Sequence, residues 1–401
     1  MDINEPLSLL AGLTPAQFMR RHWQKKPLLV RQAIPGFTPL LSRSELLKLA
    51  ASDDVESRLI VQNKTDWRML QGPFPPRSLP ALSQPAWTLL VQGVDQHVEK
   101  AQELLQRFRF IPDARMDDLM ISFATANGGV GAHFDSYDVF LLQASGSRRW
   151  KISQQKDLTL QSDVPLKILQ NFVPEEEFLL EAGDMLYLPP RYAHEGIAEA
   201  AVGHDGKAAD CMTYSIGLRA PAKRELAAEL LHRLAEFNED DDVHAENSDS
   251  KKQLYRDPGQ AATVTPAAIP LTLSTFAAEA VLQALKDPLS VACVLGEYMT
   301  ELKPSVWFDE ASAPWDESSR ETAIGLDPRT RMLYDEQHVF INGDSHRAKG
   351  ADARLMQGLA DRRVLSAKEL SKASAAALAL LADWYDAGWI KAVKRYPCSK
   401  Q

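Results

Sequence analysis

Apolar positions recur at helical spacing through the first part of the chain. Thr14 followed by Pro15 is typical of a helix start, because a threonine side chain accepts from the free N–H groups and proline fits the first turn. Apolar spacing predicts further helices over 42–50 and 87–108, and the apolar run 28–30 predicts a strand. We therefore expect a mixed, mainly helical segment at the N-terminus.

The pattern changes to short apolar runs separated by turn residues between about 116 and 220. Gly146, Gly183 and the pair Pro189 and Pro190 mark turns. Many short strands at close spacing are typical of a β-sandwich or a small barrel. The predicted strands cover 119–123, 138–143, 149–152, 178–180, 185–188 and 212–217.

Helices and a hairpin are predicted after this β-rich part. A helix is expected over 223–237, followed over 238–269 by a polar, acidic stretch that indicates a linker or a long, mobile loop. The order strand, strand, helix, helix then predicts a small winged-helix-like module. Its elements, and the helix before them, cover 272–302, 331–334, 338–341, 351–362 and 366–387.

The composition is that of a soluble globular protein with an acidic balance. Of 401 residues, 45% are hydrophobic and 25% charged, and the formal net charge is −9. No apolar run approaches the roughly 20 residues that cross a membrane, and no secretory signal is visible at the N-terminus. The three scattered cysteines, Cys211, Cys293 and Cys398, favour a reducing cytoplasm. The acidity argues against direct nucleic-acid binding and fits a basic protein partner, although solubility alone also explains it.

Two histidines and a carboxylate form the strongest candidate site. His133 and Asp135 are two residues apart, which on a strand places both side chains on one face. His194 follows the Pro-Pro pair, and the strands in between can return it to the same point. Two histidines and one carboxylate with open positions suit Fe(II) better than structural zinc. A lone His-x-Asp pair is common, so the prediction depends equally on the glycine-rich lead 128–131 and on the strand context.

An iron site of this kind needs a second substrate to supply two electrons to O₂, and the usual one is 2-oxoglutarate. The distal carboxylate of 2-oxoglutarate requires a buried cation. Arg148 and Arg149 are neighbours on a predicted strand, so only one can face inward, and the residues barely choose between them. Arg148 is the better candidate. Ser122 and Thr213 can bond the same carboxylate, with ordinary strand hydrogen bonding as the alternative.

Five segments carry a resemblance to a known enzyme family. They are 21–29 (RHWQKKPLL), 117–123 (DDLMISF), 129–140 (GVGAHFDSYDVF), 148–150 (RRW) and 214–221 (YSIGLRAP). In these segments the chain resembles the JmjC-type 2-oxoglutarate oxygenases, and more narrowly the bacterial ribosomal oxygenases. The resemblance covers nearly the whole chain.

The resemblance implies a role for each candidate residue. His133, Asp135 and His194 would be the iron ligands and so the catalytic centre. Arg148, rather than Arg149, would bind 2-oxoglutarate, with Ser122 and Thr213 nearby.

The resemblance also implies that Asp118, Tyr137 and Ser215 line the pocket for a substrate arginine, and an acidic side chain suits a cationic one. The structural alternatives are a turn or cap role for Asp118 and a place in the barrel-rim core for Tyr137.

The implied fold is mainly β with helices (α+β), built on a double-stranded β-helix (jelly-roll or cupin) JmjC core. A helical dimerisation region, hence a homodimer, and a C-terminal winged-helix-like domain accompany it. The expected division is an N-terminal helical or mixed segment over 1–110, the core over 111–221, the helical region over 222–303 with the loop 238–269, and the winged-helix-like domain over 304–401.

The implied activity is hydroxylation of an arginine side chain of large-subunit ribosomal protein sixteen in the cytoplasm, with Fe(II), 2-oxoglutarate and O₂, giving succinate and CO₂. The alternatives are histidine hydroxylation or demethylation on the same centre, or a cupin-like binding module without turnover. Residues 202–207 depart from the family pattern as an inserted polar loop, in which His204 is expected to be exposed and not a ligand.

Overall fold

The structure is a computed structural model that describes residues 2–63, 66–200, 210–243, 255–256, 267, 269–285, 288–311, 315 and 322–393. The chain divides into two compact units. The first comprises Met1–Ala220 and Lys303–Phe308, and the second comprises Pro221–Leu302 and Asp309–Gln401. Each unit has its own hydrophobic core.

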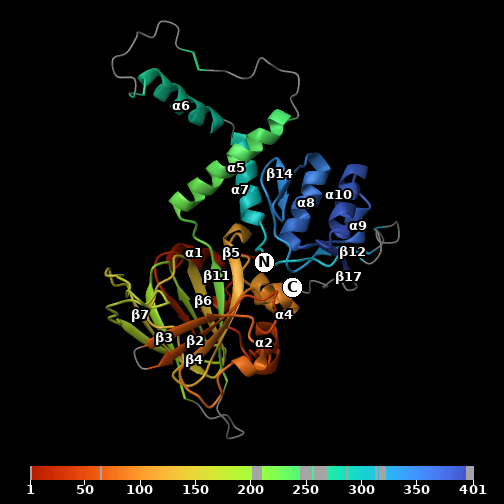
Figure 1. The fold of residues 1–401 in the computed structure, drawn as a ribbon. Coiled ribbons are helices and arrows are strands. Elements are labelled where there is room, and N and C mark those ends of the chain that lie inside the picture. Colours follow the sequence, from red (N-terminus) through yellow and green to blue (C-terminus); the bar gives the residue numbers. More distant parts are fainter. Residues whose placement is uncertain are drawn as a thin grey trace. The chain divides into compact units, whose positions relative to one another are not determined.

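The first unit is built on two antiparallel sheets (Figure 1). The larger has the strand order β1-β9-β6-β11-β5-β4-β2-β3, and the smaller has the order β10-β7-β8. Apolar side chains of β6 and β9 pack with those of β7 and β8 in one cluster, which joins the sheets. The strands are β1 (Leu28–Val30), β2 (Ser57–Asn63), β3 (Asp66–Gln71), β4 (Trp87–Val91), β5 (Met116–Ala124), β6 (Asp138–Ser145), β7 (Ser147–Ser153), β8 (Glu176–Glu181), β9 (Met185–Leu188), β10 (Ala193–Ala198) and β11 (Cys211–Leu218).

Most of the β-rich prediction is confirmed. All six predicted strands lie within β5 to β9 and β11, and the predicted strand 28–30 is β1. The helices α1 (Pro15–Arg21) and α2 (Arg43–Ala50) begin at capping boxes, in which Thr14 and Ser42 accept from the backbone of the third helical residue. The short helices η1 (Ser8–Leu10), η2 (Pro76–Ser78) and η3 (Asp113–Arg115) complete the unit's N-terminal part.

The prediction of a helix over 87–108 is wrong. Residues 87–91 form β4, in which every residue is buried, and only then do α3 (Val94–His97) and α4 (Glu99–Gln106) follow. β4 lies between β2 and β5, so it shows no polar alternation and its apolar run resembles that of a buried helix. The N-terminal segment is therefore not mainly helical, because it adds β1 to β4 to the large sheet.

The segment 21–29 is tied to the large sheet through a buried carboxylate. Asp138 is fully buried at the start of β6 and accepts hydrogen bonds from Tyr187 Oη (2.6 Å), Gln24 Nε2 (3.0 Å) and Arg115 (3.1 Å). β1 then pairs with β9. The N-terminal segment thus supports β6 and β9, which form one wall of the barrel.

The second unit contains helices and two small sheets. α5 (Lys223–Val243) continues past its predicted end at Phe237, and the single helix predicted over 272–302 is described as α6 (Leu271–Ala284) and α7 (Pro288–Thr300). Most of the predicted loop 238–269 lies outside the described residues.

The predicted hairpin is confirmed as β13 and β14, whereas the helix predicted over 366–387 is two helices, each capped by its own serine, Ser366 and Ser374. The C-terminal elements are β12 (Ala323–Leu326), β13 (Met332–Tyr334), β14 (His338–Ile341), β15 (Asp344–Arg347), α8 (Gly350–Arg362), β16 (Val364–Leu365), α9 (Ala367–Leu370), α10 (Ala375–Asp386) and β17 (Ile390–Val393).

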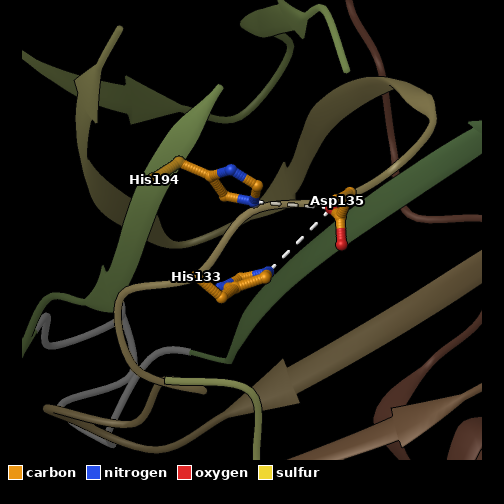
Figure 2. Close-up of side chains that lie close together, drawn as sticks. All are labelled: His133, Asp135 and His194. Carbon is orange, nitrogen blue, oxygen red and sulfur yellow. Dashed lines mark ion pairs between the residues drawn. The ribbon is translucent and has the colours of Figure 1, made fainter. Parts of the chain in front are cut away.

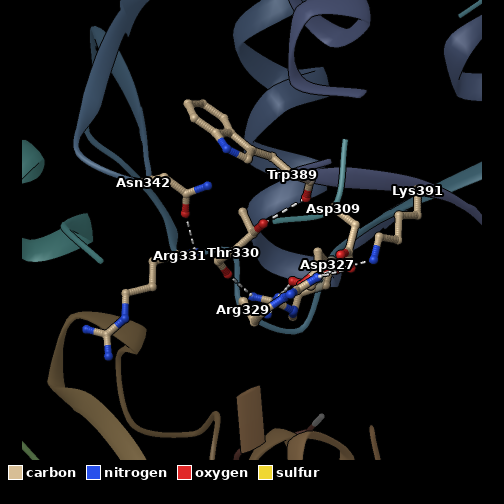
Figure 3. A network of polar contacts seen from close by, with 9 residues as sticks. Asp309, Asp327, Arg329, Thr330, Arg331, Asn342, Trp389 and Lys391 are labelled. Carbon is tan, nitrogen blue, oxygen red and sulfur yellow. Dashed lines mark hydrogen bonds and ion pairs between the residues drawn. The ribbon is translucent and has the colours of Figure 1, made fainter. Parts of the chain in front are cut away.

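A buried aspartate joins the ends of this module (Figure 3). Asp327, directly after β12, is 2% exposed and accepts from Arg329 (2.8 Å) and from Lys391 on β17 (2.6 Å). Burial raises the pKa of the Asp327 carboxyl, but its hydrogen bonds to Arg329 and Lys391 outweigh burial and hold that pKa below its ordinary value. No helix among the described residues is long and apolar enough to span a membrane.

Candidate active site

A cavity of about 290 Å³ opens within the first unit. Its floor is made by every second residue of five neighbouring strands, because alternate side chains of a strand share one face. The smaller sheet and the loops between strands supply the rest. The strand residues are Arg58 and Ile60 (β2), Leu90 (β4) with Gln92 just after it, Asp118, Met120 and Ser122 (β5) with Asp117 beside them, Val139 and Leu141 (β6), Arg148 and Trp150 (β7), His194 (β10), and Thr213, Ser215 and Gly217 (β11).

His133, Asp135 and His194 meet in this cavity, as predicted (Figure 2). Asp135 Oδ2 lies 3.6 Å from His194 Nε2 and 3.9 Å from His133 Nε2, and the three ligand atoms all lie within 4.8 Å of one another. Two ligands about 2.1 Å from one metal can be at most about 4.2 Å apart. Both His–Asp distances satisfy that limit, so each histidine is placed to share an ion with Asp135.

The two histidines are brought together by a backbone bridge and not by the predicted strand. His133 and Asp135 lie in the irregular link between β5 and β6. The His133 N–H donates to His194 O (2.9 Å), and the His194 N–H donates to His133 O (2.8 Å). The parity argument for His133 and Asp135 is therefore wrong in its reason, although the two side chains do converge.

Glycine is required in the lead to His133. Gly131 has φ +80°, a left-handed conformation that side chains disfavour. A Cβ at Gly129 would lie 2.7 Å from the carbonyl oxygen of Gly196 on β10. The link can thus pass close enough to β10 to form the bridge that holds the histidines.

Both imidazoles present the same nitrogen to the carboxylate. His133 Nδ1 lies 3.0 Å from Gly131 O, and His194 Nδ1 lies 2.9 Å from Tyr192 O. A carbonyl oxygen only accepts, so each Nδ1 carries the proton and each Nε2 keeps a free electron pair. The rings are therefore oriented and in the tautomer that a metal ligand needs.

His194 is almost fully buried, at 3% exposure. Burial, together with the neighbouring His133, lowers the pKa of His194 to about 4. The ring is then neutral at pH 7, as metal binding requires. The indole of Trp150 packs beside it, with ring centroids 5.8 Å apart, over Gly196 where any Cβ would lie 2.7 Å from the indole.

The Pro-Pro turn precedes His194 and also holds the loop that carries Asp135. Pro189 and Pro190 lead from β9 to β10, and the N–H of Arg191, which has φ +63°, donates to Asp135 O (2.7 Å). This hydrogen bond attaches the loop that carries Asp135 to the turn that precedes His194.

The structure separates the two candidate arginines. Arg149 points outward and pairs with Glu177 and Glu199, each at 2.6 Å. Arg148 is 3% exposed and borders the cavity, and its Nε and Nη2 have no hydrogen-bond partner among the described residues. Two buried, unpartnered N–H donors of one guanidinium match the fork that binds a carboxylate.

Ser122 and Thr213 lie opposite each other on β5 and β11 and both border the cavity. Ser122 Oγ contacts Thr213 O at 3.4 Å, and Thr213 Oγ1 donates to Gln143 Oε1 at 2.9 Å. Gln143, a buried residue of β6, was not predicted as part of this group. The hydroxyls are thus placed in the same cavity as Arg148.

Asp118, Tyr137 and Ser215 border the same cavity. Asp118 is 5% exposed, and its Oδ2 accepts from the N–H of Gly93 at 3.1 Å. Burial, with the nearby charge of Asp135, raises the pKa of Tyr137 well above its ordinary value, so its hydroxyl remains a donor.

Two polar residues of the cavity escaped prediction from the sequence. Arg58 lies on β2 and donates to Gln92 Oε1 at 2.6 Å, while its Nε is buried without a partner among the described residues. Gln92 falls in the stretch 87–108 that was predicted as a helix, and no element was predicted at Arg58. The inserted loop 202–207 and His204 lie outside the described residues.

Comparison with known proteins identifies the class. Residues 103–226 match the JmjC domain, and residues 283–391 match the ROXA-like winged helix. The chain thus contains one region that matches the JmjC domain and a second that matches a winged helix, and the predicted fold is confirmed.

Its relatives are ribosomal oxygenases. Over 212 residues it is 40% identical to the Escherichia coli ribosomal protein uL16 3-hydroxylase, a match covering 52% of this chain and 53% of that one. The chain thus spans about half the length of the curated relatives it matches. The crystal structure of E. coli YcfD matches with a TM-score of 0.80 and 28% identity, covering 94% of this chain and 98% of the other. YcfD in complex with cobalt and 2-oxoglutarate matches with a TM-score of 0.78 and 28% identity, over 94% and 98% of the two chains.

Proposed function

We propose that the protein is an Fe(II)- and 2-oxoglutarate-dependent dioxygenase that hydroxylates an arginine side chain of the large-subunit ribosomal protein uL16. The observation that carries this proposal is one cavity that combines three metal-binding side chains with a buried, unpartnered guanidinium. The 40% identity to a uL16 3-hydroxylase supports the choice of substrate. A C–H bond becomes C–OH and 2-oxoglutarate becomes succinate and CO₂, with one atom of O₂ in each oxidised product.

His133, Asp135 and His194 are the proposed iron ligands. Two neutral imidazoles and one carboxylate leave coordination positions open, which is the donor set of non-haem Fe(II) oxygenases. Iron bound there supplies the oxidation chemistry, and the chain supplies its position. The carbonyls of Gly131 and Tyr192 hold the rings, and the bridge between His133 and His194 holds the backbone.

Arg148 is the proposed partner of the distal carboxylate of 2-oxoglutarate. A buried guanidinium without hydrogen bonds is costly, so the site favours an anion that pairs with it. Ser122 and Thr213 add hydroxyls to the same wall of the cavity. Trp150, which borders both Arg148 and His194, keeps this part of the cavity apolar around its charged groups.

Asp118, Tyr137 and Ser215 are the proposed contacts of the substrate arginine. The carboxylate attracts a guanidinium, and the two hydroxyls offer further polar contacts beside it. A basic ribosomal protein also suits the net charge of −9, which favours encounter with a protein partner over direct binding to nucleic acid. Such a substrate implies a cytoplasmic enzyme.

The helical region 222–303 is the proposed dimerisation region of a homodimer. α6 carries exposed apolar side chains at Leu271 (80%), Val281 (56%) and Leu282 (59%), which a helix in a lone subunit would leave in water. The division of the rest of the chain into an N-terminal segment (1–110), a catalytic core (111–221) and a winged-helix-like domain (304–401) also stays a prediction.

The direct test uses the purified protein with Fe(II), 2-oxoglutarate, O₂ and recombinant uL16. Succinate should form in step with a uL16 product that has gained one oxygen atom, mapped to an arginine by fragmentation mass spectrometry. An oxidised histidine or a demethylated lysine would move the protein to a different reaction on the same centre. Metal binding without any consumption of 2-oxoglutarate would make it a binding module instead.

A further inference from the structure

A lysine from far along the chain contacts Asp118, one of the carboxylates that border the cavity. Lys303 Nζ lies 2.9 Å from Asp118 Oδ2 and 3.9 Å from Asp117 Oδ1. Lys303 belongs to the segment Lys303–Phe308, which is part of the first unit although the preceding helix α7 is not. The side chain is 26% exposed, so this is a partly buried ion pair with an almost fully buried carboxylate.

The two oxygens of Asp118 are used differently. Both hydrogen bonds that Asp118 accepts within the described part of the chain reach Oδ2, one from Lys303 and one from the N–H of Gly93. Oδ1 lies 3.8 Å from the point where a side chain at Gly217 would begin, and Gly217 borders the cavity. Oδ1 is therefore the oxygen left to an incoming group.

Asp117 pairs more closely with Arg219 than with the lysine. Its Oδ1 accepts from Arg219 Nε at 3.0 Å, closer than Lys303 at 3.9 Å. Loss of the lysine charge would remove the shorter contact, to Asp118, together with the longer one, to Asp117, and would leave the Asp117–Arg219 pair in place. Lys303 is therefore a point at which the proposed substrate site can be perturbed mainly through Asp118.

We propose that Lys303 is a positioning residue that sets how the substrate cation binds to Asp118, an inference that rests on the proposed function. A guanidinium binds a free carboxylate through both oxygens. With Oδ2 held by Lys303 and Gly93, the cation is received by Oδ1 alone. The lysine thereby restricts the substrate side chain to one orientation and offsets part of the attraction of the carboxylate.

Removal of the lysine charge should therefore raise the affinity for the substrate and lower the fraction of turnovers that hydroxylate it. Oδ2 then keeps only the hydrogen bond from the Gly93 N–H and can accept a second one from the substrate, and the charge of Asp118 is no longer shared with a lysine, so a cationic substrate binds more tightly. The same change allows more than one orientation, and fewer turnovers place the target carbon correctly. More 2-oxoglutarate is then consumed for each hydroxylated product.

The test compares Lys303→Met, which keeps the length and removes the charge, with Lys303→Arg, which keeps the charge. Lys48→Met, at an exposed position of α2, controls for net charge. Calorimetry measures the binding of recombinant uL16 to the full-length proteins without O₂, and turnover assays measure KM and the ratio of hydroxylated product to succinate. For Lys303→Met we expect Kd and KM to fall on the order of fivefold, as for loss of one partly exposed ion pair, with a lower product ratio.

Lys303→Arg and Lys48→Met should both lie near the wild type in Kd, in KM and in the ratio of hydroxylated product to succinate. A Lys303→Met variant with unchanged or weaker binding and an unchanged product ratio would overturn the role of Lys303 and leave the proposed function intact. Failure of the wild type itself to bind or oxidise uL16 would refute the proposed function, and with it the substrate that Lys303 is inferred to orient.

Discussion

The sharpest prediction concerns Arg148, whose removal should harm function while sparing the fold. The guanidinium is 3% exposed, and its Nε and Nη2 have no partner among the described residues. A buried polar group without a hydrogen bond costs about 1–3 kcal/mol, more when it is charged. Replacing Arg148 by Met removes that cost and keeps most of the side-chain volume. Without 2-oxoglutarate, the variant should therefore be at least as stable as the wild type.

Binding of 2-oxoglutarate should respond in the opposite direction. Loss of one partner of a buried, hydrogen-bonded charge pair costs about 2–5 kcal/mol, which corresponds to a rise in Kd of about 30-fold to several thousand-fold. A ligand at 100 times its Kd stabilises a protein by about 2.7 kcal/mol, and at the same concentration that gain should fall below about 1 kcal/mol in the variant. Differential scanning fluorimetry with a redox-stable metal, with and without 2-oxoglutarate, measures both effects in one experiment.

Arg149→Met is the matched control, because Arg149 is the outward neighbour that pairs with Glu177 and Glu199 at the surface. Exposed ion pairs contribute about 0–1 kcal/mol, and 2-oxoglutarate should stabilise this variant as it does the wild type. The reasoning is refuted if Arg148→Met is clearly less stable than the wild type without 2-oxoglutarate, or if 2-oxoglutarate stabilises both variants equally.

Three further predictions concern the metal ligands and the winged helix. Asp135→Ala should abolish metal binding and succinate formation while circular dichroism stays unchanged; retained decarboxylation of 2-oxoglutarate contradicts this role. Because burial lowers the pKa of His194 to about 4, the unfolded chain takes up a proton near pH 6.5 that the fold does not. In urea titrations, the free energy of unfolding of the metal-free protein should therefore fall by about 2 kcal/mol between pH 7.5 and 5. If a His194→Gln variant loses as much over the same range, His194 is not the cause of the pH dependence. The pKa of Asp327 is held below its ordinary value, so the stability that this carboxylate contributes is present above about pH 4 and lost in stronger acid. Asp327→Asn should therefore destabilise the C-terminal module at pH 7. Equal urea midpoints for the variant and the wild type would count against the network.

Prediction from sequence succeeded where residue types and their local context together decide the chemistry. Two histidines and an aspartate, with the glycine-rich lead 128–131 and predicted strands around them, indicate a metal site of the Fe(II) oxygenase type. The three side chains therefore meet as predicted, although His133 and Asp135 lie in an irregular link and not on a strand. Strand parity indicates that only one of the neighbours Arg148 and Arg149 can face inward. Only the packing in the folded chain distinguishes Arg148 from Arg149.

Prediction failed where long-range pairing decides. The run 87–91 has no alternation because neighbouring strands cover it, so its sequence is equally suited to a buried helix. β10 was not predicted because its short sequence, Ala193–Ala198, contains few β-formers, and pairing with β7 makes it a strand. Arg58 and Gln92 were missed for the same reason, since they reach the cavity only through the N-terminal strands.

The central claim is that this cavity transfers oxygen from O₂ to an arginine of uL16. Its most direct test is turnover of recombinant uL16 under isotopically heavy O₂, with Asp135→Ala as the control. One heavy oxygen atom should appear on a single arginine of uL16 and a second in succinate, and neither should appear with the variant. Heavy oxygen in succinate with none in uL16, or label on a residue other than arginine, would contradict it.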